Sequence, residues 1–175
     1  MSKWWLITWT THGSWLPGDP RGFQTWKGRE HVPPPKRYAN PGEQTYDAND
    51  YAERHQQVQQ IAAPPVTLNV RQQEQVIAAF VGEVSKLSLL PAILSIDKNH
   101  VHFLAKFGPR PIRPAVGRLK AAATRALHDQ GMTVERLWSR NCHMKSLDDP
   151  KAFENAFAYI RRHRDHGALI HVWEH

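Results

Sequence analysis

Two short segments separated by a three-residue turn constrain the fold of this chain more than any other feature. Residues 89–96 are an apolar run. In residues 100–107 every second side chain is apolar, as in a strand with one side on the core. Asp97, Lys98 and Asn99 lie between them. Asp and Asn favour turns because their side chains hydrogen-bond to the nearby backbone. We therefore expect two strands, joined by this turn, at the centre of an antiparallel sheet.

The flanking segments supply the rest of the fold. Residues 3–11 are aromatic and β-branched, which favours a strand, and residues 70–87 and 114–129 repeat apolar side chains at helical spacing. Residues 138–147 are typical of a short strand or hairpin, and a helix is expected from about 151 to 164. The order β-α-β-β-α-β predicts an α+β fold, a ferredoxin-like sandwich with an antiparallel sheet and an extra C-terminal helix.

Residues 14–65 differ in character from the rest of the chain. The stretch from Gly13 to Pro65 contains 8 of the 13 prolines and shows little periodicity. Long irregular stretches within compact domains are usually functional or mobile. We expect a proline-rich insertion with a short helix near 49–61, within a single domain that spans residues 1–175.

The composition indicates a soluble globular protein. Hydrophobic residues make up 41% of the chain and charged residues 22%, which is ordinary for this class. Its one cysteine, Cys142, excludes a disulfide framework and fits a reducing compartment. No run approaches the roughly 20 apolar residues of a membrane helix. We therefore expect a cytoplasmic protein with no membrane partner.

The positive charge is concentrated in one part of the sequence. The net charge is +7, and residues 1–97 balance 9 Lys and Arg against 9 Asp and Glu. Residues 98–175 hold 14 Lys and Arg against 7 Asp and Glu, together with 8 of the 11 histidines. A basic field around one region favours a polyanionic partner, above all a nucleic acid.

Four side chains in this basic region are spaced so that they can meet. His100 and His102 lie two apart on a strand and point to the same side of it. Tyr159 and His163 lie four apart on a helix and share one face. If that helix packs against the strand, three imidazoles converge on a metal ion with a phenol beside them. If the His163 ring lay more than about 6 Å from the pair, His166 would be the next candidate.

Several segments also resemble a known family. Segment 96–104 (IDKNHVHFL) resembles the (M/N)xHVHxL signature of the single-tyrosine HUH transposases, which mobilise single-stranded DNA of insertion sequences. This family includes the REP-associated tyrosine transposases of bacteria. Segments 137–141 (LWSRN), 158–163 (AYIRRH) and 7–13 (ITWTTHG) are similar to further motifs of the family. The resemblance covers most of residues 3–12 and 70–170.

The resemblance implies a function and a set of site residues. Tyr159 would be the nucleophile that cleaves single-stranded DNA through a 5′-phosphotyrosine intermediate. His100, His102 and His163 would bind a divalent metal, Mg²⁺ or Mn²⁺ in the family. Many members carry Asn or Gln where this chain has His163, and a third imidazole favours Mn²⁺, Zn²⁺ or Ni²⁺ over Mg²⁺. The implied partner is hairpin or repeat DNA, and members of the family include monomers and two-fold dimers.

Contacts to the DNA backbone are expected from basic side chains around the site. Such side chains bind phosphates as point charges or as planar forks. The candidates are Lys106, Arg118, Lys120, Arg125, Arg161 and Arg162.

Two other classes of function stay open on the sequence alone. A ferredoxin-like sheet can bind single-stranded nucleic acid without catalysis. A metal-dependent hydrolase can instead use an activated water, and Tyr159 would then only orient the substrate.

Overall fold

The computed structural model of the chain describes residues 3–14, 23–24, 31–32 and 48–174. The chain divides into two compact units. The first unit combines Met1–His12 with Val66–His175, and the second is Gly13–Pro65. The second unit starts within one residue of the insertion expected at 14–65. That the whole chain acts as a single domain stays a prediction.

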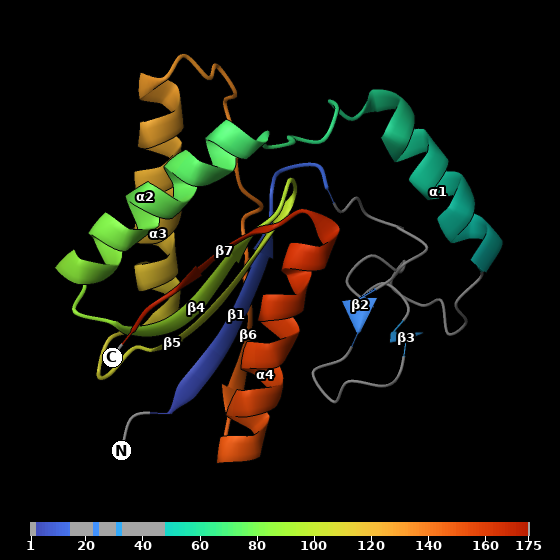
Figure 1. Cartoon of the computed structure of the whole chain (residues 1–175). Coiled ribbons are helices and arrows are strands. Elements are labelled where there is room, and N and C mark those ends of the chain that lie inside the picture. The colour runs from blue at the N-terminus through green and yellow to red at the C-terminus, as the bar shows by residue number, and fades with distance from the viewer. Residues whose placement is uncertain (1–2, 15–22, 25–30, 33–47, 175) are drawn as a thin grey trace. The chain divides into compact units, whose positions relative to one another are not determined.

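The first unit is built on a five-stranded antiparallel sheet with the strand order β6-β1-β5-β4-β7. Helices α2 and α3 cover one face of the sheet, and α4 lies on the other face (Figure 1). The strands are β1 (Trp4–Thr10), β4 (Leu90–Ile96), β5 (His100–Lys106), β6 (His143–Leu147) and β7 (Leu169–Val172). The helices are α2 (Val70–Lys86), α3 (Ile112–Asp129), α4 (Pro150–Arg162) and the 3₁₀ turn η2 (His163–His166).

Each face of the sheet has its own apolar core. On the first face, Val101 and Phe103 of β5 pack with Phe80 of α2 and Leu119 of α3. On the second face, the neighbouring residue Leu104 packs with Ile93 of β4 and Ile160 of α4. Because consecutive strand residues point to opposite faces, β5 contributes to both cores. The expected orientation of this strand is therefore confirmed, with His102 and Leu104 on the side away from Val101 and Phe103.

The predicted α+β, ferredoxin-like fold is confirmed, with one element added. The sequence predicts a C-terminal helix as the last element, whereas α4 and η2 are followed by the edge strand β7, which pairs with β4. Gly167, with φ of +89°, ends η2 in the left-handed conformation that glycine adopts without strain. The strand expected at 138–147 begins only at His143, since Trp138 forms an isolated bridge with Thr11.

The second unit contains the helix that was expected near residues 49–61. This helix, α1, spans Ala48–Ile61, and a two-stranded antiparallel pair is formed by β2 (Phe23–Gln24) and β3 (His31–Val32). Most of the proline-rich insertion predicted at 14–65 lies outside the described residues. In the part of the chain that is described, no helix is both long and apolar enough to cross a bilayer.

Candidate metal and tyrosine site

Strand β5 places two histidines side by side on the face covered by α4. His102 is buried, with 6% of its surface exposed, and His100 is partly buried at the start of the strand. Their ring centroids are 5.0 Å apart. In the sheet, His102 is paired with Thr8 of β1 on one side and with Ser95 of β4 on the other. The His pair therefore sits on a central strand, held on both sides by neighbouring strands.

Helix α4 brings the other two candidate side chains to this face. The Asp149 carboxylate caps its first turn by accepting a hydrogen bond from the backbone N–H of Ala152. Fully buried Ile160 fixes the helix on the sheet, whereas its neighbour Tyr159 keeps 43% of its surface exposed. The helix changes to a 3₁₀ turn at His163. The phenol and the third imidazole therefore lie at the C-terminal end of α4.

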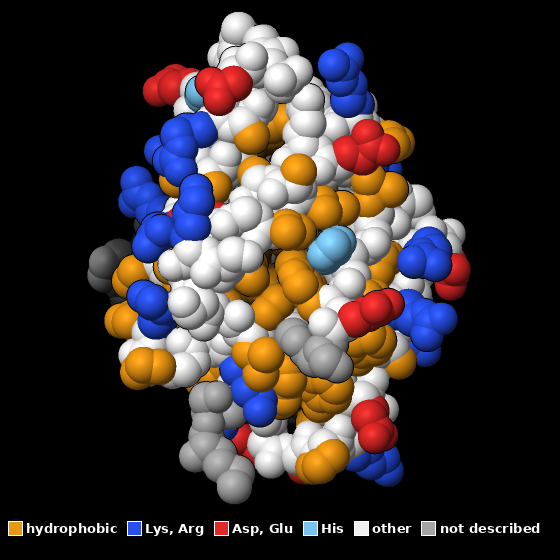
Figure 2. Space-filling model, turned by 60° about the vertical axis from the view of Figure 1, so that its left-hand side comes forward, with side chains coloured by type: hydrophobic (Ala, Val, Ile, Leu, Met, Phe, Trp, Pro, Cys, Tyr) orange, Lys and Arg blue, Asp and Glu red, His pale blue; other side chains and the backbone are white. Residues whose placement is uncertain are grey.

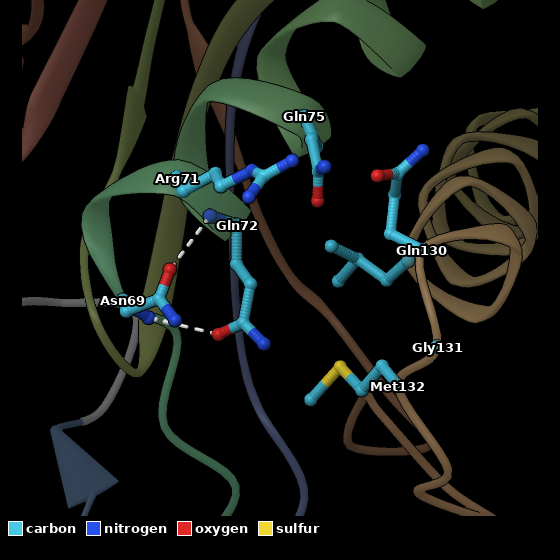
Figure 3. A pocket seen from close by; sticks show the side chains of 8 residues that line it. Asn69, Arg71, Gln72, Gln75, Gln130, Gly131 and Met132 are labelled. Carbon is cyan, nitrogen blue, oxygen red and sulfur yellow. Dashed lines mark hydrogen bonds between the residues drawn. The ribbon is translucent and has the colours of Figure 1, made fainter.

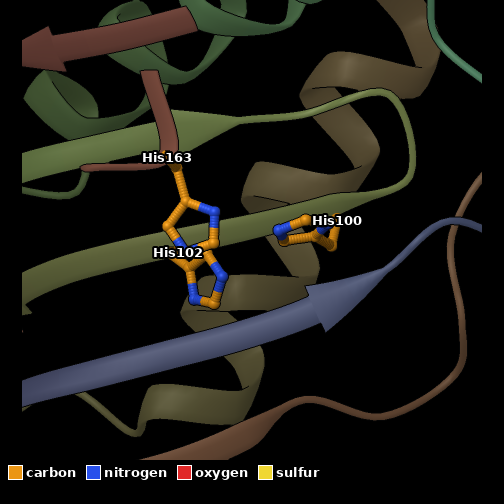
Figure 4. A group of neighbouring side chains, drawn as sticks. All are labelled: His100, His102 and His163. Carbon is orange, nitrogen blue, oxygen red and sulfur yellow. The ribbon is translucent and has the colours of Figure 1, made fainter. Parts of the chain in front are cut away.

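The three imidazoles converge, as the spacing predicts. Figure 4 shows the His163 ring, which comes from the end of α4, above His102 and beside His100. The ring centroid of His163 lies 4.4 Å from that of His102 and 5.2 Å from that of His100. One ligand nitrogen from each ring lies within 4.8 Å of the other two. His166 is exposed and is not a member of this group.

The Tyr159 phenol stands next to the same cluster. Its ring centroid is 5.3 Å from that of His102 and 4.9 Å from that of His163, and both contacts are edge-to-face. Tyr159 is thus held against two of the three imidazoles while part of its surface faces solvent. A substrate atom could reach the phenol from solvent and still lie close to the imidazoles.

Hydrogen bonds occupy one nitrogen of each strand histidine and leave the other as the possible metal ligand. The Asn99 side-chain oxygen lies 2.9 Å from Nδ1 of His100, and the Asp97 carboxylate lies 3.4 Å from the same nitrogen. Both oxygens can only accept, so Nδ1 carries the hydrogen and Nε2 keeps its lone pair. Nδ1 of His102 likewise lies 3.0 Å from the Thr8 hydroxyl. In both rings Nε2 is therefore the atom left to act as a ligand.

Two polar atoms beside the cluster lack a partner among the described residues. Nε2 of His163 and the Ser95 hydroxyl are both buried without a hydrogen bond. Buried polar groups are normally paired, and an orphan nitrogen among other ligand nitrogens is the state expected of a metal ligand without its ion. The residues present therefore fit a bound divalent cation. Sequence reasoning missed Thr8 and Ser95, which only the strand register places here.

Burial keeps the three imidazoles uncharged at neutral pH. Burial, together with the smaller effect of charges on His100 and His163, lowers the pKa of His102 to about 3. Burial also lowers the pKa of His100, an effect that Asp97 partly offsets, and the pKa of His163. A metal ion binds the neutral form of imidazole, so it competes here with few protons.

The basic residues expected to contact DNA are spread over both faces of the sheet. Arg161 and Arg162 are exposed in the last turn of α4, two and three residues after Tyr159. Lys106 lies at the opposite end of β5 from His100, with its ammonium 5.0 Å from the centroid of the Trp4 ring. On the face shown in Figure 2, Lys and Arg side chains stand on both flanks of a hydrophobic strip.

Helix α3 carries the other three candidates, on the far side of the sheet from the cluster. Nε and Nη2 of Arg118 lie 2.7 and 2.6 Å from the buried carboxylate of Glu83. The Lys120 ammonium donates to the backbone carbonyls of Ser139, at 2.8 Å, and Asn141, at 3.0 Å. Arg125 is exposed. The structure thus brings Arg161 and Arg162, but not the α3 residues, to the helix of Tyr159.

Comparison with known proteins supports the fold. No protein-family model matches the sequence, and no curated protein gives a match. A solved structure of a REP-associated tyrosine transposase bound to a REP hairpin is similar, with a TM-score of 0.54. The chain shares the fold of that transposase. The match covers 95% of this chain and 69% of the transposase chain at 11% sequence identity. At that identity the likeness shows the fold alone and assigns no role to any residue.

Proposed function

We propose that this protein is a metal-dependent tyrosine transposase or endonuclease that nicks and rejoins single-stranded DNA. The observation that carries the proposal is the position of Tyr159. Its half-exposed phenol lies edge-on to two imidazoles of a cluster that could hold a metal ion. The shared transposase fold agrees with this assignment.

His100, His102 and His163 would hold the metal, and water and phosphate oxygens would complete its shell. A divalent cation at this position would supply a Lewis acid that offsets negative charge on the scissile phosphate. Members of the family use Mg²⁺ or Mn²⁺. Three neutral imidazoles favour Mn²⁺, Zn²⁺ or Ni²⁺ relative to Mg²⁺, which prefers oxygen ligands.

Tyr159 would perform the covalent step. Its phenol oxygen forms a bond to the phosphorus while the bond from phosphorus to O3′ breaks, and the phenolic proton passes through solvent to O3′. The products are a 5′-phosphotyrosine link and a free 3′-hydroxyl. Attack of a 3′-hydroxyl on the phosphotyrosine reverses the step and restores a continuous strand. No external energy source is needed, because one phosphoester replaces another.

Basic side chains would hold the strand at the site. Arg161 and Arg162 are the phosphate contacts that we expect nearest to Tyr159, and Lys106 and Arg125 are proposed contacts further away. Arg118 and Lys120 also remain candidates, but both heads already bind groups within the protein. We expect them to contribute less to DNA affinity than the exposed residues do.

The test is a covalent adduct on a denaturing gel. The protein is incubated with a single-stranded DNA that contains a hairpin, in the presence of Mn²⁺. The native protein should form a species that survives denaturation. Tyr159→Phe should bind the DNA equally well and form none, whereas Tyr51→Phe, a matched loss of a phenol in α1, should retain the adduct.

Other outcomes would identify the two alternative classes. Cleavage that persists in Tyr159→Phe without any adduct would indicate a hydrolase that uses water. Metal-independent binding without cleavage would indicate a nucleic-acid-binding module. Either result would contradict the proposed function.

A further inference from the structure

A polar pocket lies in the first unit, away from the histidine cluster. It has a volume of about 260 Å³ and is formed by the start of α2 and the end of α3. Figure 3 shows Arg71 and Gln75 of α2 facing Gln130 and Met132 at the end of α3. With Asn69 and Gln72, the lining contains four amide side chains and one guanidinium. Neither the tyrosine chemistry nor the metal site uses these residues.

Two helix-end motifs hold the walls of this pocket in place. At the start of α2, the Asn69 side chain accepts from the backbone N–H of Gln72, and the Gln72 side chain accepts from that of Asn69. At the end of α3, Gly131 adopts a φ of +90°, and the Met132 N–H donates to the Leu127 carbonyl. This arrangement is a Schellman motif, which brings Met132 against Leu127. The pocket is therefore preformed.

Most hydrogen-bonding groups in the pocket are unused. The capping box engages the side-chain oxygens of Asn69 and Gln72 and leaves their NH₂ groups available. The side chains of Arg71, Gln75 and Gln130 have no hydrogen-bond partner in the part of the chain that the structure describes. The pocket thus offers both donors and acceptors next to the apolar side chains of Leu127 and Met132.

This composition selects a class of ligand. A phosphate would call for several cations, whereas amides outnumber the single guanidinium here by four to one. Amide side chains pair with both donors and acceptors at base edges, and Arg pairs with guanine. A flexible thioether such as that of Met132 packs against flat apolar faces. No carboxylate of the described residues lines the pocket to repel a polyanion. The volume is below that of typical drug-sized sites and suits one base.

We propose that this α2–α3 amide pocket binds one unpaired nucleobase of the single-stranded DNA substrate. The proposal rests on the proposed function, because it assigns a second contact to the same strand. It gives the enzyme a means of sequence discrimination that phosphate contacts lack.

The topology places the pocket at the same end of the sheet as the candidate active site. The Leu68 N–H, just before α2, donates to the carbonyl of Lys98, two residues before His100. The segment that follows the pocket leads to Trp138, which bridges Thr11 at the end of β1. The Thr11 N–H in turn donates to the carbonyl of Asn99. A strand bound at Tyr159 would therefore pass over this end of the sheet to reach the pocket.

The test combines pocket variants with base removal. Hairpin DNA with single-stranded flanks is prepared as a series in which each unpaired nucleotide in turn is abasic. Binding to native protein and to the double variant Gln75→Ala/Gln130→Ala is measured by fluorescence anisotropy at several salt concentrations. The variant should fold, because neither side chain makes a hydrogen bond in the described structure and neither is fully buried. Gln57→Ala, an exposed amide on α1, is the matched control.

For the native protein and the control, one abasic position should weaken binding about 10-fold, the effect of one good base contact. In the double variant that position should have no further effect, and the salt dependence should be unchanged because no phosphate contact is lost. The proposal would be overturned if no abasic position weakened binding to the native protein. It would also be overturned if the abasic position weakened binding equally in the native protein and the double variant. The proposal would also be overturned if the double variant reduced the slope of log affinity against log salt concentration by about 0.7, since this would indicate a phosphate in the pocket.

The adduct assay separates this result from the proposed function. If the adduct on Tyr159 forms but no base contributes affinity that depends on Gln75 and Gln130, only the pocket assignment fails. If the protein neither binds single-stranded DNA nor forms the adduct, both proposals fail together.

Discussion

The Thr8 hydroxyl of β1 lies 3.0 Å from Nδ1 of His102 on β5. This contact across the central strand pair holds the buried imidazole by Nδ1 and leaves Nε2 as the nitrogen that could bind a metal. Thr8→Val keeps the shape of the side chain and removes the hydroxyl. Because outer hydrogen bonds of this kind fix ligand orientation, we expect Mn²⁺ or Zn²⁺ affinity to fall about 10- to 100-fold.

Isothermal titration of the metal-free protein measures this effect. Thr124→Val is the matched control, since its hydroxyl donates to the Lys120 carbonyl within α3, on the other side of the sheet. Equal metal affinity in Thr8→Val and native protein would show that Thr8 has no part in orienting His102.

The pKa of His102 gives the metal-free protein a stability that depends on pH. In the unfolded chain this histidine binds a proton near pH 6.5, but in the folded protein only near pH 3. Between these values the unfolded state holds more protons, so folding stability falls as the pH decreases from about 6.5 toward 3. Carboxylates add their own acid dependence. The informative quantity is therefore the difference between native protein and His102→Gln.

Thermal unfolding in EDTA at pH 7, 6, 5 and 4 measures this difference. The melting temperature of His102→Gln should fall less steeply below pH 6.5 than that of the native protein. Parallel curves for the two proteins would contradict the low pKa of His102.

Local sequence patterns were enough to predict that the three histidines and the tyrosine of the candidate site lie together. Alternation along 100–107 places His100 and His102 on one side, and helical spacing places Tyr159 and His163 on one face. Both rules act over a few residues and depend little on the rest of the chain. The two pairs converge because the predicted fold packs the helix that carries Tyr159 and His163 against the strand that carries His100 and His102.

Features that depend on pairing between distant segments could not be predicted in this way. Thr8 and Ser95 flank His102 only because of the register of β1 and β4 on β5. Strand β7 has four residues, too few for a clear alternation, and it is defined by its pairing with β4. The amide pocket joins two helix ends that lie more than 50 residues apart in the sequence.

His163 should determine which metal the site prefers. Its imidazole occupies the place where many members of the similar family carry an amide. Replacing it by Asn exchanges a nitrogen ligand for an oxygen ligand, which is better suited to Mg²⁺. We expect His163→Asn to bind Zn²⁺ or Ni²⁺ more weakly and to lower the ratio of Zn²⁺ to Mg²⁺ affinity at least 10-fold.

Competition titrations with a chromophoric chelator give both affinities. The control is His166→Asn, which removes an exposed imidazole that is not part of the cluster. If His163→Asn left the ratio unchanged while His166→Asn lowered it, His166 would be the third ligand.

Arg118 and Arg125 lie on the same helix, but we expect the first to stabilise the fold and the second to bind DNA. The Arg118 guanidinium binds Glu83, whose side chain is 6% exposed, whereas Arg125 is exposed and has no ion pair within the described residues. Arg118→Met would leave a buried carboxylate with only Lys86, 3.7 Å away. We expect a loss of about 1–3 kcal/mol in unfolding free energy, because an unpaired buried charge is costly but Arg118 itself is half exposed.

Arg125→Met should change stability by less than about 0.5 kcal/mol, as surface substitutions usually do. If Arg125 contacts a phosphate, its loss should also reduce the slope of log DNA affinity against log salt concentration by about 0.7. Urea unfolding and anisotropy titrations on the two variants measure these quantities. A stable Arg118→Met protein with a reduced salt slope would assign Arg118 to the DNA rather than to the contact between α2 and α3.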